Sequence, residues 1–228
     1  MPDNKYLFFA TRKGLIKKTE LAEYQSIRQS GLVAIKLDQG DELLKTEITS
    51  GKDKILLCSS NGKSILFSEA DVRSTGRASR GVTGMRFKSG DFLVGAEVIA
   101  NQPNASTPRS LGEGGPNHPK LQVLVITENG YGKRTDLKEY REQGRGGSGI
   151  FTSKITTKTG KLVDMRALPA EAKADLLLIS SKGQVIRLEL NTVSVLGRQT
   201  QGVKLINLDP GDKVASVAVI FEEINIQT

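Results

Sequence analysis

The sequence predicts an all-β protein, a propeller-like ring of four-stranded antiparallel blades in which four repeats are visible. Three glycine signals recur in units of roughly 45 to 50 residues, which is typical of such blades, with one longer spacing between the second and third repeats. The first is a hairpin glycine after Lys or Asn, at Gly14, Gly62, Gly130 and Gly183. The second opens the third strand of each repeat, at Gly31, Gly81, Gly149 and Gly202. The third is the turn into the fourth strand, at DQGD from Asp38, KSGD from Lys88, TKTGK from Thr157 and DPGD from Asp209.

The last repeat, residues 176–219, gives the clearest strand pattern. The runs LLLIS and QVIRLEL flank Lys182-Gly183, and a two-residue hairpin turn needs the positive φ that glycine adopts at little cost. The loop GRQTQG leads to a third run, VKLINL, and DPGD leads to a fourth, KVASVAV. We therefore expect this repeat to form a four-stranded antiparallel sheet of its own.

The same pattern gives the expected limits of the repeats. They are about 5–51, 52–99, 120–170 and 173–221, in a single domain or a fragment of one that covers residues 1–228. Residues 100–119 are rich in Pro, Gly, Ser and Asn and have no periodic apolar pattern. We expect them to form a surface insertion.

Composition excludes several classes of protein. The 228 residues are 37% hydrophobic and 25% charged, which is ordinary for a globular chain and unlike a disordered one. No apolar run is long enough for a membrane span and no signal peptide is recognisable, so a cytoplasmic location is expected. The single cysteine, Cys58, permits no internal disulfide and fits a small buried side chain. With His118 as the only histidine and no clustered carboxylates, neither a metal site, a cofactor nor a histidine-based catalytic centre is expected.

The formal charge of +8 is unevenly distributed. Residues 5–19 and 72–90 carry several cations and no acid. Such clusters favour a polyanionic partner, nucleic acid before an anionic membrane. A solvated surface that maintains solubility would explain them equally well.

The strands differ in composition. First strands such as YLFFA and LQVLVI are almost wholly apolar, which predicts strands covered on both sides near the centre of the ring. Charge interrupts the second strands, at Lys17, Lys18, Lys133, Arg134 and Arg187. We expect these cations to point to solvent along the rim.

An arginine precedes the strand-opening glycine in each loop between the second and third strands. Arg77, Arg145 and Arg198 stand four residues before it, and Arg28 stands three before Gly31. Equivalent positions around a ring suit a repeating polyanion, but arginines that hydrogen-bond loop carbonyls would produce the same pattern. The most distinctive loop is QGRGGSG, made of Gln143, Gly144, Arg145, Gly146, Gly147, Ser148 and Gly149. Its glycines let backbone amides approach a phosphate, but the strand-to-helix context and Lys-Ser/Thr pair of an ATP site are missing.

Several segments together resemble one family. FFATRKGLIKKT, GRASRGVTGMRF, VITENGYGKRTDLKEYREQGRGGSG and VLGRQTQGVKLINLDPGD are similar to repeats of the C-terminal domain of the DNA gyrase A subunit, and of the related topoisomerase IV A subunit. The resemblance implies a β-pinwheel, whose blades exchange a strand with a neighbour, and a basic rim that binds and bends double-stranded DNA. It further implies two protein partners, the remainder of the gyrase A subunit and the gyrase B subunit. The expected location is the bacterial cytoplasm, at the nucleoid, and no membrane is expected as a partner. The whole enzyme then introduces negative supercoils with ATP.

The resemblance implies DNA contacts for a set of cations. They are Arg12, Lys13, Lys17, Lys18, Arg28, Arg73, Arg77, Arg80, Arg86, Lys133, Arg134, Arg145, Arg187 and Arg198. The family commonly has six repeats, and the four here are similar to the last four. The first-repeat box Gln-Arg-Arg-Gly-Gly-Lys-Gly has no full match, since QGRGGSG carries Gly144 and Ser148 in place of Arg and Lys.

Two further observations bear on function. None of Tyr6, Tyr24, Tyr131 and Tyr140 has the context of the nucleophilic tyrosine of the family's breakage domain, so the chain is not expected to be an enzyme by itself. Two alternatives to DNA wrapping stay open. One is a topoisomerase IV-type domain that selects DNA segments without strong wrapping, and the other is a scaffold whose basic loops bind an acidic protein.

Overall fold

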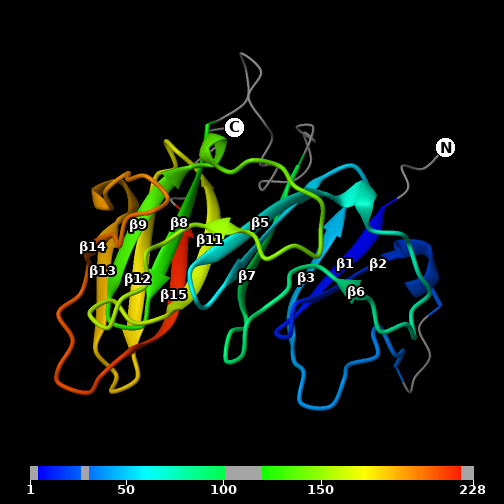
Figure 1. Cartoon of the computed structure of the whole chain (residues 1–228), viewed down its shortest axis with the longest axis horizontal. Helices are drawn as coiled ribbons and strands as arrows, with labels where there is room; N and C mark the ends of the chain where they lie inside the picture. The colour runs from blue at the N-terminus through cyan, green and yellow to red at the C-terminus, as the bar shows by residue number, and fades with distance from the viewer. Residues whose placement is uncertain (1–4, 27–30, 101–119, 222–228) are drawn as a thin grey trace, which may run out of the picture.

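The computed structural model describes residues 5–26, 31–100 and 120–221, and its strands form four antiparallel sheets that follow one another in chain order (Figure 1). The first two repeats contribute β1 (Tyr6–Thr11), β2 (Leu15–Glu20), β3 (Leu43–Thr49), β4 (Lys54–Ser59), β5 (Lys63–Ser68), β6 (Val82–Thr83) and β7 (Leu93–Ile99). The last two contribute β8 (Leu121–Thr127), β9 (Tyr131–Asp136), β10 (Ile150–Phe151), β11 (Leu162–Pro169), β12 (Ala174–Ser180), β13 (Val185–Glu189), β14 (Val203–Lys204) and β15 (Val214–Phe221). Short 3-10 helices follow the second strands, at Leu21–Tyr24, Glu69–Asp71, Leu137–Glu139 and Leu190–Thr192. The all-β prediction is confirmed.

Each repeat begins with a hairpin, as the glycine pattern predicts. Gly62 has a φ of +78° and Gly183 a φ of +89°, in the left-handed region that other residues enter only at a steric cost. The register pairs Leu57 with Ile65 across the second hairpin. The turn glycine therefore sets which residues of the two strands share a face.

The third strand of a repeat does not join its own sheet. β6 pairs with β2, β10 pairs with β5 and β14 pairs with β9, so each short strand lies in the sheet of the preceding repeat. This corrects the expectation that residues 176–219 form a four-stranded sheet of their own, because β13, β12 and β15 make a three-stranded sheet. The physical reason is that the loop before the strand-opening glycine crosses to the unpaired edge of the neighbouring hairpin.

The apolar core lies between neighbouring sheets. Ile55 of β4 belongs to a buried cluster with Phe8 of the first sheet, whereas the next residue, Leu56, belongs to a cluster with Val123 of the third. Alternate side chains of β4 therefore pack on different neighbours. β8 is buried along its whole length. The prediction that the first strands are covered on both sides is confirmed for β4 and β8.

The fourth strands of the repeats, rather than the first strands, line the space that the four sheets share, so the expectation that the first strands lie near the centre of the ring is wrong. β3 contacts β7, β7 contacts β11, and β11 contacts β15. Together they line a hollow of about 260 Å³ that contains an ionic cluster. Within it, Arg166 lies 3.1 Å from Asp164 and 3.8 Å from Glu97. Burial raises the pKa of Glu97 to about 7, because desolvation outweighs the attraction of Lys45 and Arg166.

Other expectations can be placed on the fold. Cys58 is fully buried on β4, as predicted, and burial raises the pKa of its thiol. The expected insertion 100–119 lies outside the described residues except for residue 100, and so does His118. In the part of the chain that the structure describes, no helix is long and apolar enough to cross a membrane.

Candidate nucleic-acid interface

Lys133 on β9 is fully buried, so the expectation that it points to solvent is wrong. Its ammonium group donates hydrogen bonds to the carbonyl oxygens of Gly197 and Arg198, at 2.6 and 2.7 Å, and to the hydroxyl of Thr200, at 3.1 Å. The physical reason is strand exchange. The loop that leads to β14 covers the outer edge of β9, and its inward carbonyls need a donor beneath them.

Lys17 on β2 is buried in the same way and corrects the same expectation. It donates to the carbonyl oxygen of Ala34 at 2.6 Å and to that of Arg77. Burial lowers the pKa of Lys17, and likewise that of Lys133, to about 8. Both lysines therefore tie the second strand of one repeat to the loop of the next, rather than facing a ligand.

The next position along the second strands holds Lys18, Arg134 and Arg187. Lys18 is buried and donates to the carbonyl oxygen of Glu69 at 3.1 Å. Arg134 is buried and donates through Nε to the carbonyl oxygen of Val193 at 2.9 Å. The expectation of solvent-facing side chains is therefore wrong for these two and confirmed for Arg187, which is exposed because no loop covers β13.

Two loop arginines hold equivalent positions between repeats. Nη1 of Arg145 donates to the carbonyl oxygen of Thr83 at 3.1 Å, and Nη1 of Arg198 donates to that of Phe151 at 2.8 Å. Thr83 and Phe151 are the second residues of β6 and β10, so the two bonds correspond. The alternative explanation, in which the loop arginines hydrogen-bond to carbonyl oxygens, is therefore correct for Nη1 of Arg145 and Arg198. Within the described residues, Nη2 of neither arginine has a hydrogen bond.

Arg77 has the corresponding place in the second repeat and is half-buried. Its backbone N–H donates to the carboxylate of Glu23 at 3.2 Å, as that of Arg198 donates to Glu139 at 3.2 Å. Glu23 and Glu139 belong to the 3-10 helices that follow the second strands, so both loops are fixed at the same point. Arg28, the remaining loop arginine, lies outside the described residues.

The other cations expected at the interface are exposed: Arg12, Lys13, Arg73, Arg80 and Arg86. Arg80 is neutralised by Asp38, whose carboxylate accepts from Nε at 2.7 Å and from Nη2 at 2.6 Å. Arg12 stacks on the ring of Phe92, with 4.3 Å from Cζ to the ring centroid. Within the described residues, Arg73 and Arg86 have no acidic partner. Both guanidinium groups are therefore unpaired with acids and exposed at the surface.

The glycines of the loop 143–149 serve a close approach to β5. A Cβ at Gly149 would lie only 2.3 Å from the carbonyl oxygen of Ser64, and a Cβ at Gly147 would lie 3.4 Å from Cδ1 of Ile65. The N–H of Gly146 already donates to a backbone carbonyl at 2.7 Å. Sequence analysis did not foresee this packing use, because it depends on a strand of another repeat.

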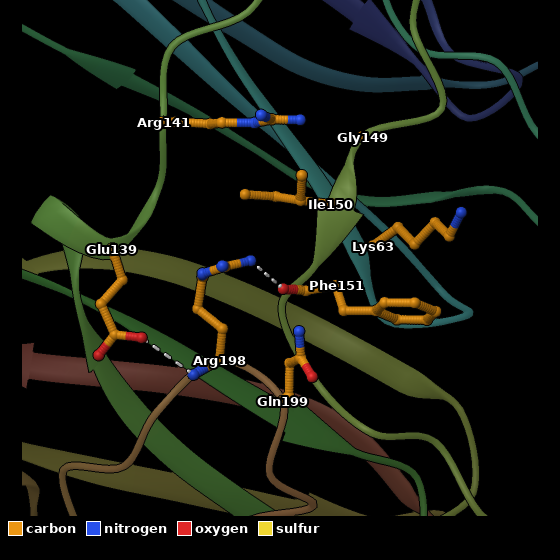
Figure 2. Close-up of a pocket in the computed structure, with 8 residues that line it drawn as sticks. All are labelled: Lys63, Glu139, Arg141, Gly149, Ile150, Phe151, Arg198 and Gln199. Carbon is orange, nitrogen blue, oxygen red and sulfur yellow. Dashed lines mark hydrogen bonds between the residues drawn. The ribbon is translucent and has the colours of Figure 1, made fainter.

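A surface hollow of about 440 Å³ lies beside the last loop (Figure 2). It is lined by Lys63, Glu139, Arg141, Gly149, Ile150, Phe151, Arg198 and Gln199. Three cations and one carboxylate are among these residues, so the net charge of the lining is positive and favours an anion. Nε of Arg198 is buried and has no hydrogen-bond partner, while Nη1 is bonded to Phe151, as Figure 2 shows.

Of these lining residues, the sequence predicted only Gly149 and Arg198 as site residues, and Lys63, Arg141 and Gln199 are among those it missed. They come from the second, third and fourth repeats, and strand exchange brings them together. No spacing along the chain signals such a hollow, because the glycine period describes each repeat separately.

The tyrosines have structural environments. Tyr140 is buried and its hydroxyl lies within hydrogen-bond distance of the Thr152 hydroxyl. Burial raises the pKa of Tyr140, which opposes formation of a phenolate. Tyr131 is also buried, at the start of β9.

Comparison with known proteins places this architecture in a family. The sequence model described as the DNA gyrase C-terminal domain, a beta-propeller, matches residues 5–50, 53–100, 122–169 and 174–220. The chain belongs to the DNA gyrase C-terminal domain family. The β-pinwheel fold implied by the sequence resemblance is confirmed, and the exchanged third strands are part of it.

Curated gyrase subunits are similar over nearly the whole chain. The DNA gyrase A subunit of Mycolicibacterium smegmatis is 42% identical over 218 residues, which are 95% of this chain and 24% of that protein. Its counterpart from Deinococcus deserti is 40% identical over 217 residues, which are 94% of this chain and 25% of that protein. The chain therefore spans about a quarter of the length of these relatives.

Solved structures agree with the assignment. A DNA gyrase A C-terminal domain superimposes with a TM-score of 0.75 and 29% identity, covering 96% of this chain and 67% of that one. The C-terminal domain of DNA topoisomerase IV superimposes with a TM-score of 0.81 and 23% identity, covering 96% and 62%. The second likeness concerns the fold alone.

Within this gyrase-family chain, the box-like loop 143–149 has two positions that face open space. A Cβ at Gly144 would meet no atom within 4 Å, and Ser148 is exposed. The two residues that differ from the family's box are therefore free of packing roles.

Proposed function

We propose that this chain binds double-stranded DNA without sequence preference and bends it around its outer edge, as the C-terminal module of the gyrase A subunit. In that role it supports ATP-dependent negative supercoiling by the whole enzyme. Its partners are the rest of the gyrase A subunit and the gyrase B subunit, and its location is the bacterial nucleoid in the cytoplasm. We expect no turnover from the chain alone. The observation that carries the proposal is the equivalent placement of Arg145 and Arg198 at successive junctions between repeats.

The junctions suit phosphates because the arginines are held from behind. One guanidinium N–H binds a carbonyl of the donated strand, which fixes the plane of the group and leaves other N–H groups for a phosphate oxygen. Lys133 supports one such loop from below without reaching solvent. A fixed guanidinium loses less side-chain entropy when DNA binds than a mobile one.

The hollow beside Arg198 offers a place where a DNA phosphate could bind. Lys63, Arg141 and Arg198 line a space of about 440 Å³, in which Nη1 of Arg198 is held by the carbonyl oxygen of Phe151. A phosphate oxygen that enters there would be attracted by three cations and could accept from Nη2 of Arg198, which has no hydrogen bond within the described residues. We assign the hollow as one phosphate position on the DNA path.

Bending has an energetic requirement that the number of contacts must meet. Smooth bending of a site of 20 to 30 base pairs costs on the order of 1 to 6 kcal/mol, which several phosphate contacts together can offset. Contacts of this kind position the duplex but carry no base code. If about 8 phosphates are neutralised, log affinity should fall against log salt with a slope near −7.

The test is DNA affinity as a function of salt concentration, by fluorescence anisotropy with duplexes of unrelated sequence. Changing Arg77, Arg145 and Arg198 together to Ala should weaken binding to all duplexes and flatten the slope by roughly 3. Lys138→Ala is a control, because Lys138 is exposed and paired with Asp136. A slope shallower than about −2 for the unchanged chain, or no effect of the triple change, would contradict the proposal.

Plasmid relaxation by a topoisomerase in the presence of the chain then separates the remaining functions. A change in linking number supports wrapping. Binding without that change supports the topoisomerase IV-type alternative, in which DNA segments are selected without strong wrapping. Tight binding to an acidic protein, with only millimolar DNA affinity, supports the scaffold alternative.

A further inference from the structure

Phe151, the second residue of β10, places an aromatic ring on the surface at a junction between repeats. It is 52% exposed, whereas Phe8 and Phe67 are 0% exposed within their sheets. The equivalent positions of β6 and β14 hold Thr83 and Lys204, which are also exposed but are hydrophilic. The fold therefore does not require an apolar side chain at this position, and the exposed ring leaves apolar surface in water.

The backbone that carries the ring is held at several points. Phe151 is paired with Lys63 where β10 joins β5. Its carbonyl oxygen accepts from Nη1 of Arg198 at 2.8 Å. The next residue, Thr152, is buried and donates from its N–H to the carbonyl oxygen of Gly62 at 2.8 Å. A ring on a strand that is fixed in this way loses little entropy when a partner covers it.

Positive charge lies around the ring. Nζ of Lys63 lies 5.2 Å from the centre of the Phe151 ring, and Arg141 and Arg198 line the same hollow (Figure 2). In the part of the chain that the structure describes, neither Lys63 nor Arg141 has an acidic partner. The contact with Lys63 accounts for part of the placement, but a cation over an exposed ring contributes only modest stability. The surface therefore suits a partner that presents phosphates next to apolar atoms.

The backbone of duplex DNA has this combination, because each phosphate is bonded to a deoxyribose whose C2′ carries only hydrogen. An anionic membrane has it too, but binding to a membrane surface uses an apolar face several residues wide. Of the residues that line the hollow, Phe151 alone is a large exposed apolar side chain. Proteins that bind single strands stack successive bases on aromatic side chains, and one ring offers no such series. The observations therefore favour the duplex.

We propose that the ring of Phe151 packs against deoxyribose of the bound duplex, while Lys63 and Arg198 bind the adjoining phosphates. This inference rests on the proposed function, because it needs a duplex at the outer edge of the chain. It adds a contact that selects DNA over RNA. A ribose in the same place would set its 2′-hydroxyl against the ring, and a hydroxyl buried without a hydrogen-bond partner costs free energy.

An apolar contact and a phosphate contact respond differently to salt. Phosphate contacts release counterions, so they set the slope of log affinity against log salt. Burial of the Phe151 ring multiplies the affinity by the same factor at every salt concentration, and it makes the heat-capacity change of binding more negative. The ring should therefore affect the intercept and the heat capacity, whereas the cations alone determine the slope.

The test measures DNA affinity of the whole chain and of Phe151→Thr by fluorescence anisotropy over a range of salt concentrations. Threonine fits the fold here, because the equivalent Thr83 pairs normally with β2. Affinity should fall by about threefold to tenfold at every salt concentration, with the slope unchanged. Calorimetric titrations at several temperatures should give a less negative heat-capacity change. Val195→Thr is the matched control and should change neither quantity, because Val195 is 47% exposed but lies outside the hollow.

Substituted duplexes test the sugar contact itself. Single ribonucleotides placed at intervals in both strands of a DNA duplex add 2′-hydroxyls and leave the number of phosphates unchanged. The unchanged chain should bind such a duplex about twofold or more weakly than the DNA duplex, because some of the hydroxyls meet the ring. Phe151→Thr should bind the two duplexes equally. Phe151→Leu should lie between the two proteins, because it keeps a smaller apolar side chain.

Several results would overturn the proposal. One is an equal DNA affinity of Phe151→Thr and the unchanged chain, and another is a larger loss for single-stranded DNA than for the duplex. Weaker binding of Phe151→Thr to anionic lipid vesicles, with DNA affinity unchanged, would assign the ring to a membrane instead. A slope shallower than about −2 for the unchanged chain contradicts the proposed function as well, whereas a slope near −7 with no effect of Phe151→Thr contradicts this inference alone.

Discussion

The loops 195–202 and 142–149 lie at equivalent junctions but rest on different supports. The last loop crosses β9 over Lys133, which donates to two of its carbonyl oxygens. The glycine-rich loop crosses β5 over Ile65, which is fully buried and has no hydrogen to donate. Nevertheless, Arg145 and Arg198 bind equivalent carbonyls. Strand exchange, rather than the side chain beneath the loop, therefore determines where the rim arginine lies.

The two kinds of support alternate along the chain. The third position after the hairpin glycine holds Lys17, Ile65, Lys133 and Ile186 in the four repeats. Where the residue is lysine, its ammonium group donates hydrogen bonds to carbonyl oxygens of the loop above it. Where it is Ile65, the loop backbone packs directly on the side chain, because the loop residues in contact are glycines. Ile186 has neither partner, because no described loop covers β13.

The largest effect should come from breaking the close approach of the glycine-rich loop. Gly149→Ala places a methyl group 2.3 Å from the Ser64 carbonyl at a φ of +71°, so the free energy of unfolding should fall by about 3 kcal/mol or more. Gly144→Ala, in the same loop, meets open space and should change it by less than about 0.5 kcal/mol. Urea unfolding of both variants checks this. Equal losses would show that the loop does not depend on contact with β5.

The next effect concerns the polar support. Lys133→Met removes three hydrogen bonds and leaves the carbonyl oxygen of Arg198 without its donor, whereas that of Gly197 still accepts from Thr200, so the free energy of unfolding should fall by about 2 kcal/mol. At the equivalent position, Ile65→Met conserves volume and should cost less than about 1.5 kcal/mol. Chemical denaturation of the two variants gives the comparison. If Lys133→Met were as stable as the unchanged chain, the lysine would not support the loop.

The arginines of the two loops should differ in how much each contributes to DNA affinity. The Arg145 guanidinium donates to two carbonyls, those of Asp71 and Thr83, whereas that of Arg198 donates to one, so fewer of its N–H groups are engaged. Arg198→Ala should therefore lower DNA affinity severalfold and flatten the salt slope by about 1, and Arg145→Ala should flatten it less. Anisotropy titrations at several salt concentrations measure both. The reverse order would assign the main phosphate contact to the glycine-rich loop.

The sequence predicted the hairpins because each depends on one local requirement, a glycine with positive φ, as at Gly62. It could not predict that Lys133 is buried, since the loop that covers it comes from residues more than sixty positions later. The hollow around Arg198 was out of reach for the same reason. An amphipathic reading assigns a charged strand position to solvent unless a segment from another repeat supplies its hydrogen-bond partners.

The smallest effect is a dependence on pH that only the lysine-supported loops should show. The folded pKa of Lys133 is about 8, below the ordinary 10.5, so between these values the unfolded chain binds more protons and unfolding free energy rises with pH. From about pH 7.5 to about pH 9, Lys133 should add up to about 1 kcal/mol. Urea unfolding at both pH values should therefore show a smaller increase in Lys133→Met than in the unchanged chain. Ile65→Met should keep the full increase, because no titrating group is lost beneath its loop. Identical increases in all three proteins would mean that the Lys133 ammonium is not desolvated beneath the last loop.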